Sequence, residues 1–201
     1  MDVDAHIRSK LRVKWNELLP YTGWARITRE QLPEIWNELG YKVGAEIGVQ
    51  WGGFSQSILE KIPGVTLCCI DIWGPFPGGR PSQERQDRIY RRAVAVLSQY
   101  KGVTVRFIRK TSMDALADIE DGSLDFVYID AAHDFDNVMM DIIGWSKKVK
   151  IGGIVSGHDY IHLHAGGIIP AVRGYVEGHC ITQWYLTSGD YPTPSFFWVK
   201  K

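Results

Sequence analysis

The chain has 201 residues, enough to bury one hydrophobic core and too few to make two ordinary domains the expectation. Its 23 Lys and Arg side chains balance 23 Asp and Glu side chains, so no net field attracts the protein to nucleic acid or to anionic lipid. No apolar run reaches the length of a membrane span, and residues 1–10 lack the apolar core of a signal peptide. We therefore expect a cytoplasmic protein that binds neither nucleic acid nor a membrane.

Residues 1–40 carry two helical patterns and form an N-terminal extension. Apolar side chains recur at helical spacing over residues 4–19. A second helix is expected over residues 28–40, because Thr28 and Gln31 can form a capping box at its start. These two helices could cover one edge of a sheet, close over a substrate as a lid, or provide a surface for a homodimer.

Strand and helix patterns alternate through the main domain, residues 41–201, which predicts an α/β fold with a doubly wound, mostly parallel sheet. Strands are expected at 43–47, 65–70, 103–108, 124–129 and 151–156, and helices at 54–62, 82–99, 135–148 and 170–177. Two further strand patterns, at 181–186 and 195–199, are joined by a turn-rich segment. Such neighbours pair antiparallel, so the sheet should end in a C-terminal hairpin.

The first predicted strand ends in a glycine-rich turn, residues 45–55, with the sequence AEIGVQWGGFS. Glycine lets the backbone turn sharply and approach a ligand, and the helix that follows aims free N–H groups at that ligand. The spacing differs from the G-x-G-x-x-G of dinucleotide sites. It resembles the first motif of class I S-adenosylmethionine-dependent methyltransferases, which implies that Glu46, Gly48, Gly52 and Ser55 contact that cofactor. A glycine turn that binds nothing is the structural alternative.

Two later segments extend the predicted cofactor site. Asp71 ends the second strand, where a carboxylate can accept hydrogen bonds from ribose hydroxyls, and this would serve an NAD enzyme equally well. Trp73 could stack on the adenine or be an ordinary packed tryptophan. By the same resemblance, Ser112 and Met113 lie where the family contacts the adenine, although Ser112 could instead cap a short helix.

Acidic and imidazole side chains follow two more strands. The segment LDFVYIDAAHDFD delivers Asp130 and His133, and the segment GGIVSGHDY delivers His158 and Asp159. Since open α/β sheets bind ligands beyond the carboxyl ends of their strands, these side chains should meet at one edge. Carboxylates alone suit Mg²⁺, whereas added imidazole favours Mn²⁺, Fe²⁺ or Zn²⁺. Helix capping by His133 and packing of His158 near the core are the structural alternatives.

These two segments resemble the small metal-dependent O-methyltransferases, a branch that includes catechol and macrocin-type enzymes. The resemblance implies that Asp130 and Asp159 bind a divalent metal, most simply Mg²⁺, that Asp130 also contacts the cofactor, and that His133 is the general base. The branch uses asparagine as a third ligand where this chain has Tyr160, so His158 or water would have to complete the site.

The resemblance implies a seven-stranded sheet in the order 3-2-1-4-5-7-6 and transfer of a methyl group to a hydroxyl of a small molecule. Two loops, residues 73–82 and 161–167, are expected to select the substrate, with His162 and His164 in the second. Two other functions remain open on the residues: a Rossmann oxidoreductase that uses NAD, and a cofactor-binding, methyltransferase-like protein without catalysis. The glycine spacing disfavours the first, and the presence of Asp130, His133 and Asp159 together disfavours the second.

Overall fold

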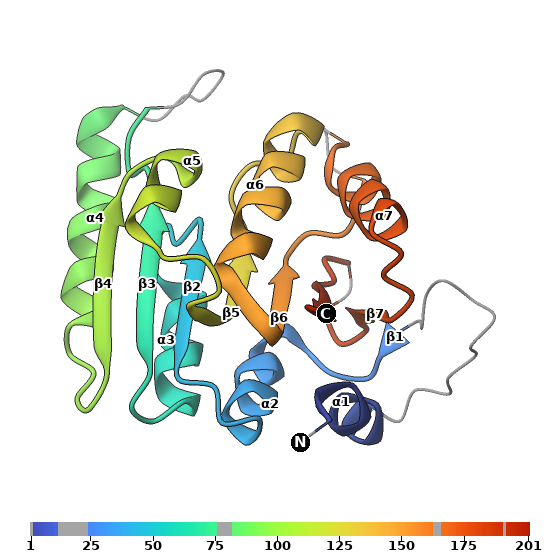
Figure 1. The fold of residues 1–201 in the computed structure, drawn as a ribbon. Coiled ribbons are helices and arrows are strands. Elements are labelled where there is room, and N and C mark those ends of the chain that lie inside the picture. Colours follow the sequence, from blue (N-terminus) through green and yellow to red (C-terminus); the bar gives the residue numbers. More distant parts are fainter. Residues whose placement is uncertain (1, 12–23, 76–81, 163–165, 191) are drawn as a thin grey trace.

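The computed structural model describes residues 2–11, 24–75, 82–162, 166–190 and 192–201. In this part of the chain the strands form a single mixed sheet in the order β1-β7-β8-β6-β5-β2-β3-β4 (Figure 1). The strands are β1 (Trp24–Ala25), β2 (Val43–Ile47), β3 (Thr66–Asp71), β4 (Thr104–Arg109), β5 (Leu124–Ile129), β6 (Val149–Gly157), β7 (Trp184–Thr187) and β8 (Phe196–Val199).

The order of the seven main strands confirms the predicted 3-2-1-4-5-7-6 arrangement. Strands β2 to β6 pair in parallel, and β8 runs antiparallel to both β6 and β7. The sequence did not predict β1, which pairs in parallel with β7 at the edge of the sheet, with Trp24 opposite Leu186. A strand of two residues is too short to show the alternation by which strands are recognised.

Helices cover both faces of the sheet (Figure 1). The α-helices are α1 (Val3–Leu11), α2 (Leu32–Glu38), α3 (Gly53–Lys61), α4 (Gln83–Leu97), α5 (Ser112–Ala115), α6 (Phe135–Lys148) and α7 (Ile168–Gly178), with 3₁₀ turns η1 (Arg29–Gln31) and η2 (Leu116–Asp118). Side chains of α1 to α4 pack into one hydrophobic cluster, and side chains of α5 to α7 pack into the other. Strand β5 is buried along its whole length because it lies between both clusters.

The N-terminal region differs from the single helix predicted over residues 28–40. Here η1 precedes α2, because Pro33 has no N–H to donate and the first turn closes in the 3₁₀ manner, from Leu32 to the carbonyl of Arg29. The predicted contact of Gln31 is present, with the Thr28 N–H donating to its side chain at 3.0 Å. Of the helix predicted over 4–19, residues 12–19 lie outside the described residues.

Helix α2 is joined to the sheet by Trp36. This side chain is fully buried and stacks on Phe126 of β5, with ring centroids 4.2 Å apart. The described part of the N-terminal region therefore packs into the main core. Every helix in the described part of the chain is too short or too polar to span a lipid bilayer.

Candidate active site

The connectivity of the sheet changes direction between β2 and β5. From β2 the chain proceeds to β3 and β4 on one side, whereas β5 is followed by β6 on the other. In open α/β sheets, ligands bind beyond the carboxyl ends of the strands at such a switch point. We therefore expect a ligand-binding site among the segments that follow β2, β5 and β6.

Gly48 lies directly at this switch point. Its φ is +90°, and a Cβ atom built on it would lie 2.0 Å from the carbonyl oxygen of Asp130. The two chain segments are held this close because the Asp130 N–H donates to the carbonyl of Ile47 at 2.7 Å. Only glycine fits this position, so packing alone accounts for Gly48. Gly52 also has a left-handed backbone, with φ +81°, where it caps the start of α3.

Glu46 and Ser55 lie beneath the glycine turn. Both side chains are buried, and the Ser55 hydroxyl donates to the Glu46 carboxyl group. Burial raises the pKa of Glu46 to about 8, although this hydrogen bond opposes the shift. The pair fixes α3 to β2, and the predicted contact of these two residues with a cofactor stays a prediction.

Asp71 links the turns that follow β2 and β3. Its two oxygens accept hydrogen bonds from the backbone N–H groups of Gln50, at 2.8 Å, and Trp73, at 2.7 Å. Burial nevertheless raises its pKa. Both donor residues have positive φ values, 50° and 36°, which for side chains other than glycine marks a strained turn. The ribose contact of Asp71 stays a prediction.

Trp73 is a packed side chain in this structure. It is fully buried, its ring centroid lies 4.9 Å from that of Tyr90, and its indole N–H donates to the Gln50 carbonyl at 3.0 Å. This is the packed alternative that the sequence left open, and stacking on adenine stays a prediction.

Ser112 and Met113 begin the short helix α5. Thr111, not Ser112, caps this helix, since the Thr111 hydroxyl accepts from the Asp114 N–H at 3.1 Å. The capping alternative for Ser112 is therefore wrong. The Ser112 hydroxyl instead donates to Asp141 and accepts from the Trp145 indole N–H at 2.7 Å, which joins α5 to α6. The adenine contact stays a prediction for Ser112 and for the half-buried Met113.

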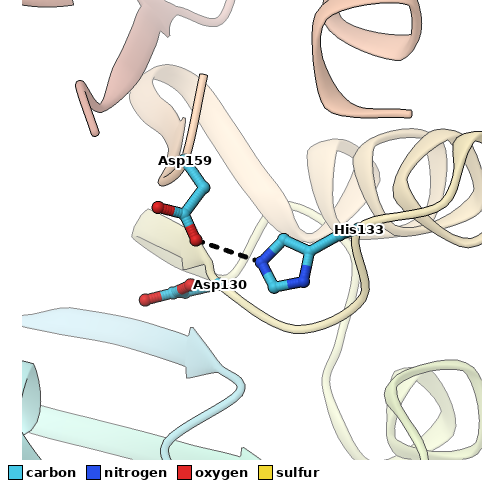
Figure 2. Close-up of side chains that lie close together, drawn as sticks. All are labelled: Asp130, His133 and Asp159. Carbon is cyan, nitrogen blue, oxygen red and sulfur yellow. Dashed lines mark hydrogen bonds and ion pairs between the residues drawn. The ribbon is translucent and has the colours of Figure 1, made fainter. Parts of the chain in front are cut away.

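Three of the predicted side chains come together beyond β5 and β6. Asp130, His133 and Asp159 each direct one ligand atom to within 4.8 Å of the others (Figure 2). His133 Nε2 lies 3.0 Å from Asp159 Oδ2, and His158 Nδ1 lies 3.1 Å from Asp159 Oδ1. Asp134, not His133, caps α6, because its side chain accepts from the Asn137 N–H. The helix-capping alternative for His133 is therefore wrong.

The surroundings shift the pKa values of the two carboxyl groups in this cluster, Asp159 and Asp130, in opposite directions. Hydrogen bonds from His133 and His158 hold the pKa of Asp159 well below its usual range. The same bond to Asp159 raises the pKa of His133. Burial raises the pKa of Asp130, against the nearby positive charges. Asp159 also has a φ of +53°, a strained conformation of the kind found at functional sites.

Tyr160 lies apart from this cluster. Its ring is buried against Trp184, with centroids 5.6 Å apart, and its hydroxyl accepts from Arg173 Nε at 3.2 Å. The described donors that could hold a metal are therefore Asp130, His133 and Asp159. This set of two carboxylates and one imidazole fits a divalent cation, and the imidazole favours Mn²⁺ or Fe²⁺ over Mg²⁺.

Sequence reasoning missed Arg29. One of its terminal nitrogens, Nη1, lies 3.1 Å from His158 Nε2 and 3.7 Å from Asp130 Oδ2. Its Cζ also lies 4.8 Å from the ring centroid of Phe54. Arg29 comes from the N-terminal region, about a hundred residues before the cluster, and no motif surrounds it. Only the fold brings it to the site.

A small hollow lies beside the cluster. It is lined by Asp130, His133 and His158 and by the apolar residues Ile129, Ala131, Ala132, Val138, Ile168 and Phe196. The hollow has a volume of about 10 Å³, which fits a group the size of a hydroxyl and not a whole small molecule. Of the two loops expected to select a substrate, residues 76–81 and 163–165, including His164, lie outside the described residues.

Comparison with known families decides between the two enzyme classes left open by the sequence, a methyltransferase and an NAD-dependent oxidoreductase. Residues 45–160 match the model of a methyltransferase domain family, a segment that contains the glycine turn and the whole acidic cluster. The chain belongs to this family. The chain therefore carries a methyltransferase domain on a sheet with the class I order 3-2-1-4-5-7-6, and the NAD-dependent alternative is set aside.

Similar proteins agree with this fold. The chain is 29% identical over 118 residues to the uncharacterized protein y4gI of Sinorhizobium fredii, and this match spans 59% of the chain but only 12% of that longer protein. Among solved structures, the O-methyltransferase NovP has a TM-score of 0.64 at 18% identity, covering 86% of this chain and 78% of that one. The Bacillus cereus O-methyltransferase in complex with SAH has a TM-score of 0.60 at 16% identity, covering 86% and 80%. The N-methyltransferase NodS from Bradyrhizobium japonicum has a TM-score of 0.55 at 13% identity, covering 86% and 94%.

Proposed function

We propose that this enzyme transfers the methyl group of S-adenosylmethionine to a hydroxyl group of a small molecule, with His133 as the general base. The observation that carries the proposal is the His133–Asp159 hydrogen bond of 3.0 Å beside an apolar hollow at the switch point of the sheet. Binding of the cofactor alone does not require an imidazole paired with a carboxylate at this position.

The residues of the site would contribute three effects. S-adenosylmethionine supplies an electrophilic methyl group when bound. The His133 imidazole would accept the proton of the substrate hydroxyl, a step for which a side chain that titrates near neutral pH is suited. The Asp159 carboxylate would stabilise the imidazolium that results, while the apolar walls would orient the hydroxyl and exclude water.

Metal assistance is a further part of the proposal. Asp130 and Asp159 would hold a divalent cation, and His133 would remain the base beside it. Such an ion supplies positive charge that lowers the pKa of a nearby hydroxyl. If the ion is bound, the carboxylates of the cluster would hold it, and the substrate oxygen would be held by the ion next to His133.

Calorimetric titration tests the cofactor and the metal. The protein is titrated with S-adenosylhomocysteine and separately with NAD, each with added Mg²⁺ or Mn²⁺ and with a chelator. We expect binding of S-adenosylhomocysteine and not of NAD, and a heat of metal binding that is lost in the Asp130→Asn variant. Metal assistance is excluded if the chelator changes neither binding nor turnover.

Substitution of His133 tests the base. His133→Ala should lower turnover by about 10²- to 10⁴-fold, the usual contribution of a general base, and leave the affinity for S-adenosylhomocysteine nearly unchanged. Equal loss of both quantities would argue for a structural role. Small phenols and sugars are assayed beside amines of the same scaffold, and methylation of the amines alone would overturn the hydroxyl assignment.

A further inference from the structure

We infer that Arg29 is a positioning residue that acts through His158 and Asp159 to fix the tautomer of His133. These four side chains form one continuous chain of contacts, Arg29 to His158 to Asp159 to His133, with separations of 3.1, 3.1 and 3.0 Å. The inference rests on the proposed role of His133 as the base.

The direction of each hydrogen bond follows from the chemistry of the groups. A guanidinium group has only donors, so Arg29 Nη1 donates and His158 Nε2 accepts. The proton of a neutral His158 must then lie on Nδ1, from which it donates to Asp159 Oδ1. Because a carboxylate only accepts, the second oxygen of Asp159 receives the Nε2–H of His133.

This chain of bonds leaves one nitrogen of His133 free to act as a base. With the proton of the neutral ring on Nε2, Nδ1 carries the lone pair. Figure 2 shows this second ring nitrogen on the side of the imidazole away from Asp159. His133 therefore presents Nδ1 to the substrate, and Asp159 orients the ring from the other side, as a carboxylate does for a catalytic imidazole.

Arg29 is held firmly enough for this role. Its backbone N–H donates to Asp190 at 2.6 Å, in the turn that joins β7 to β8. Its guanidinium lies over two aromatic rings, 4.8 Å from the centroid of Phe54 and 5.7 Å from that of Tyr128. Since Phe54 lies in the first turn of α3 and Tyr128 lies on β5, these contacts hold the guanidinium against the elements that flank the switch point.

The tautomers can be measured without any assay of turnover. A ¹⁵N-histidine spectrum of the whole chain, recorded above the titration range of histidine, separates Nδ1–H from Nε2–H rings, and His133→Gln and His158→Gln variants assign the signals. We expect Nδ1–H for His158, although free histidine favours the other form, and Nε2–H for His133. An Nε2–H form of His158 in the unaltered protein would overturn the inference.

Substitution of Arg29 tests the link to catalysis. Arg29→Met should shift the His158 signals toward the Nε2–H form and lower kcat by about 10- to 100-fold, the usual effect of removing a group that orients a site residue, with unchanged affinity for S-adenosylhomocysteine. Arg88→Met, on the exposed face of α4, is the matched control and should change neither quantity. A raised KM with unchanged kcat and unchanged tautomers would instead show that Arg29 binds the substrate.

The proposed function and the hydrogen-bond chain can be disproved separately. If the unaltered protein shows the expected tautomers but transfers no methyl group to any hydroxyl, the proposed function fails and the hydrogen-bond chain stands. If turnover is present and depends on His133 but not on Arg29, the chain fails and the proposed function stands.

Discussion

At Gly48 the turn after β2 packs against the segment that follows β5 too closely for any Cβ atom. An alanine there would place its Cβ 2.0 Å from the Asp130 carbonyl oxygen and would have to adopt a φ of +90°. Because backbone strain and overpacking each cost about 1–3 kcal/mol, Gly48→Ala should lower the free energy of unfolding by about 2–6 kcal/mol in urea titrations. It should also displace Asp130 and weaken S-adenosylhomocysteine binding.

Gly53 provides the control for this prediction. It lies five residues further along the same turn, and a Cβ built there meets no atom within 4 Å. Gly53→Ala should therefore change the free energy of unfolding by less than about 1 kcal/mol, with a gain favoured by the helix propensity of alanine. If both variants lost the same stability, the close approach at Gly48 would not be the cause.

Sequence reasoning located the side chains of the cluster because they directly follow strands. Asp130 comes after the buried run of β5, and His158 with Asp159 comes after that of β6, so strand ends alone place them at one edge. Arg29 could not be found in this way, since its position depends on how a segment without any motif docks on the sheet. The hidden pairing of Glu46 with Ser55 is likewise a matter of side-chain packing, which strand patterns do not specify.

At the scale of the elements, helix α2 is the link between the N-terminal region and the sheet. Trp36 is fully buried, stacks on Phe126 and meets Phe54 edge to face at 6.2 Å. Trp36→Ala should cost about 3–5 kcal/mol in urea titrations, as for other large-to-small core substitutions. Because η1, which begins at Arg29, leads directly into α2, turnover of this variant should be lost at the same urea concentration as its folded structure.

A substitution at an exposed position of α2, Glu34, is the control for Trp36→Ala, because it alters the same helix without removing a side chain from the core. Glu34 pairs with Lys61 at 2.9 Å on the surface, and Glu34→Ala should cost less than about 1 kcal/mol. A small effect of Trp36→Ala, equal to that of Glu34→Ala, would mean that α2 is not part of the cooperative core.

The alternation of strand and helix patterns in the sequence predicted the main elements after residue 41. Strand β1 was not predicted, because it depends on pairing with β7, and the break between η1 and α2 was not predicted, because it depends on Pro33.

At the scale of the whole molecule, the buried carboxyl groups set how stability depends on pH. Burial raises the pKa of Glu46 from 4.5 to about 8 and that of Asp141 from 3.8 to about 6. In each case the folded protein binds the proton more tightly than the unfolded chain. The stability contributed by each group is therefore fully present below its unfolded pKa, and it is lost as the pH rises toward the folded value.

Because Glu46 and Asp141 lose their stabilising effect over different pH ranges, one variant at each residue can separate their contributions. Glu46→Gln keeps an acceptor for the Ser55 hydroxyl and should remove a fall of up to about 1.4 kcal/mol per pH unit between pH 6 and pH 8. Asp141→Asn should act only at lower pH, between about 4 and 6, since Asp141 is already ionised above that range. The measurement is the free energy of unfolding from urea titrations at each pH, compared with the unaltered protein. If Glu46→Gln leaves the slope between pH 6 and pH 8 unchanged, Glu46 is ionised in the folded protein, and its carboxylate would then be available to a cationic group of the cofactor.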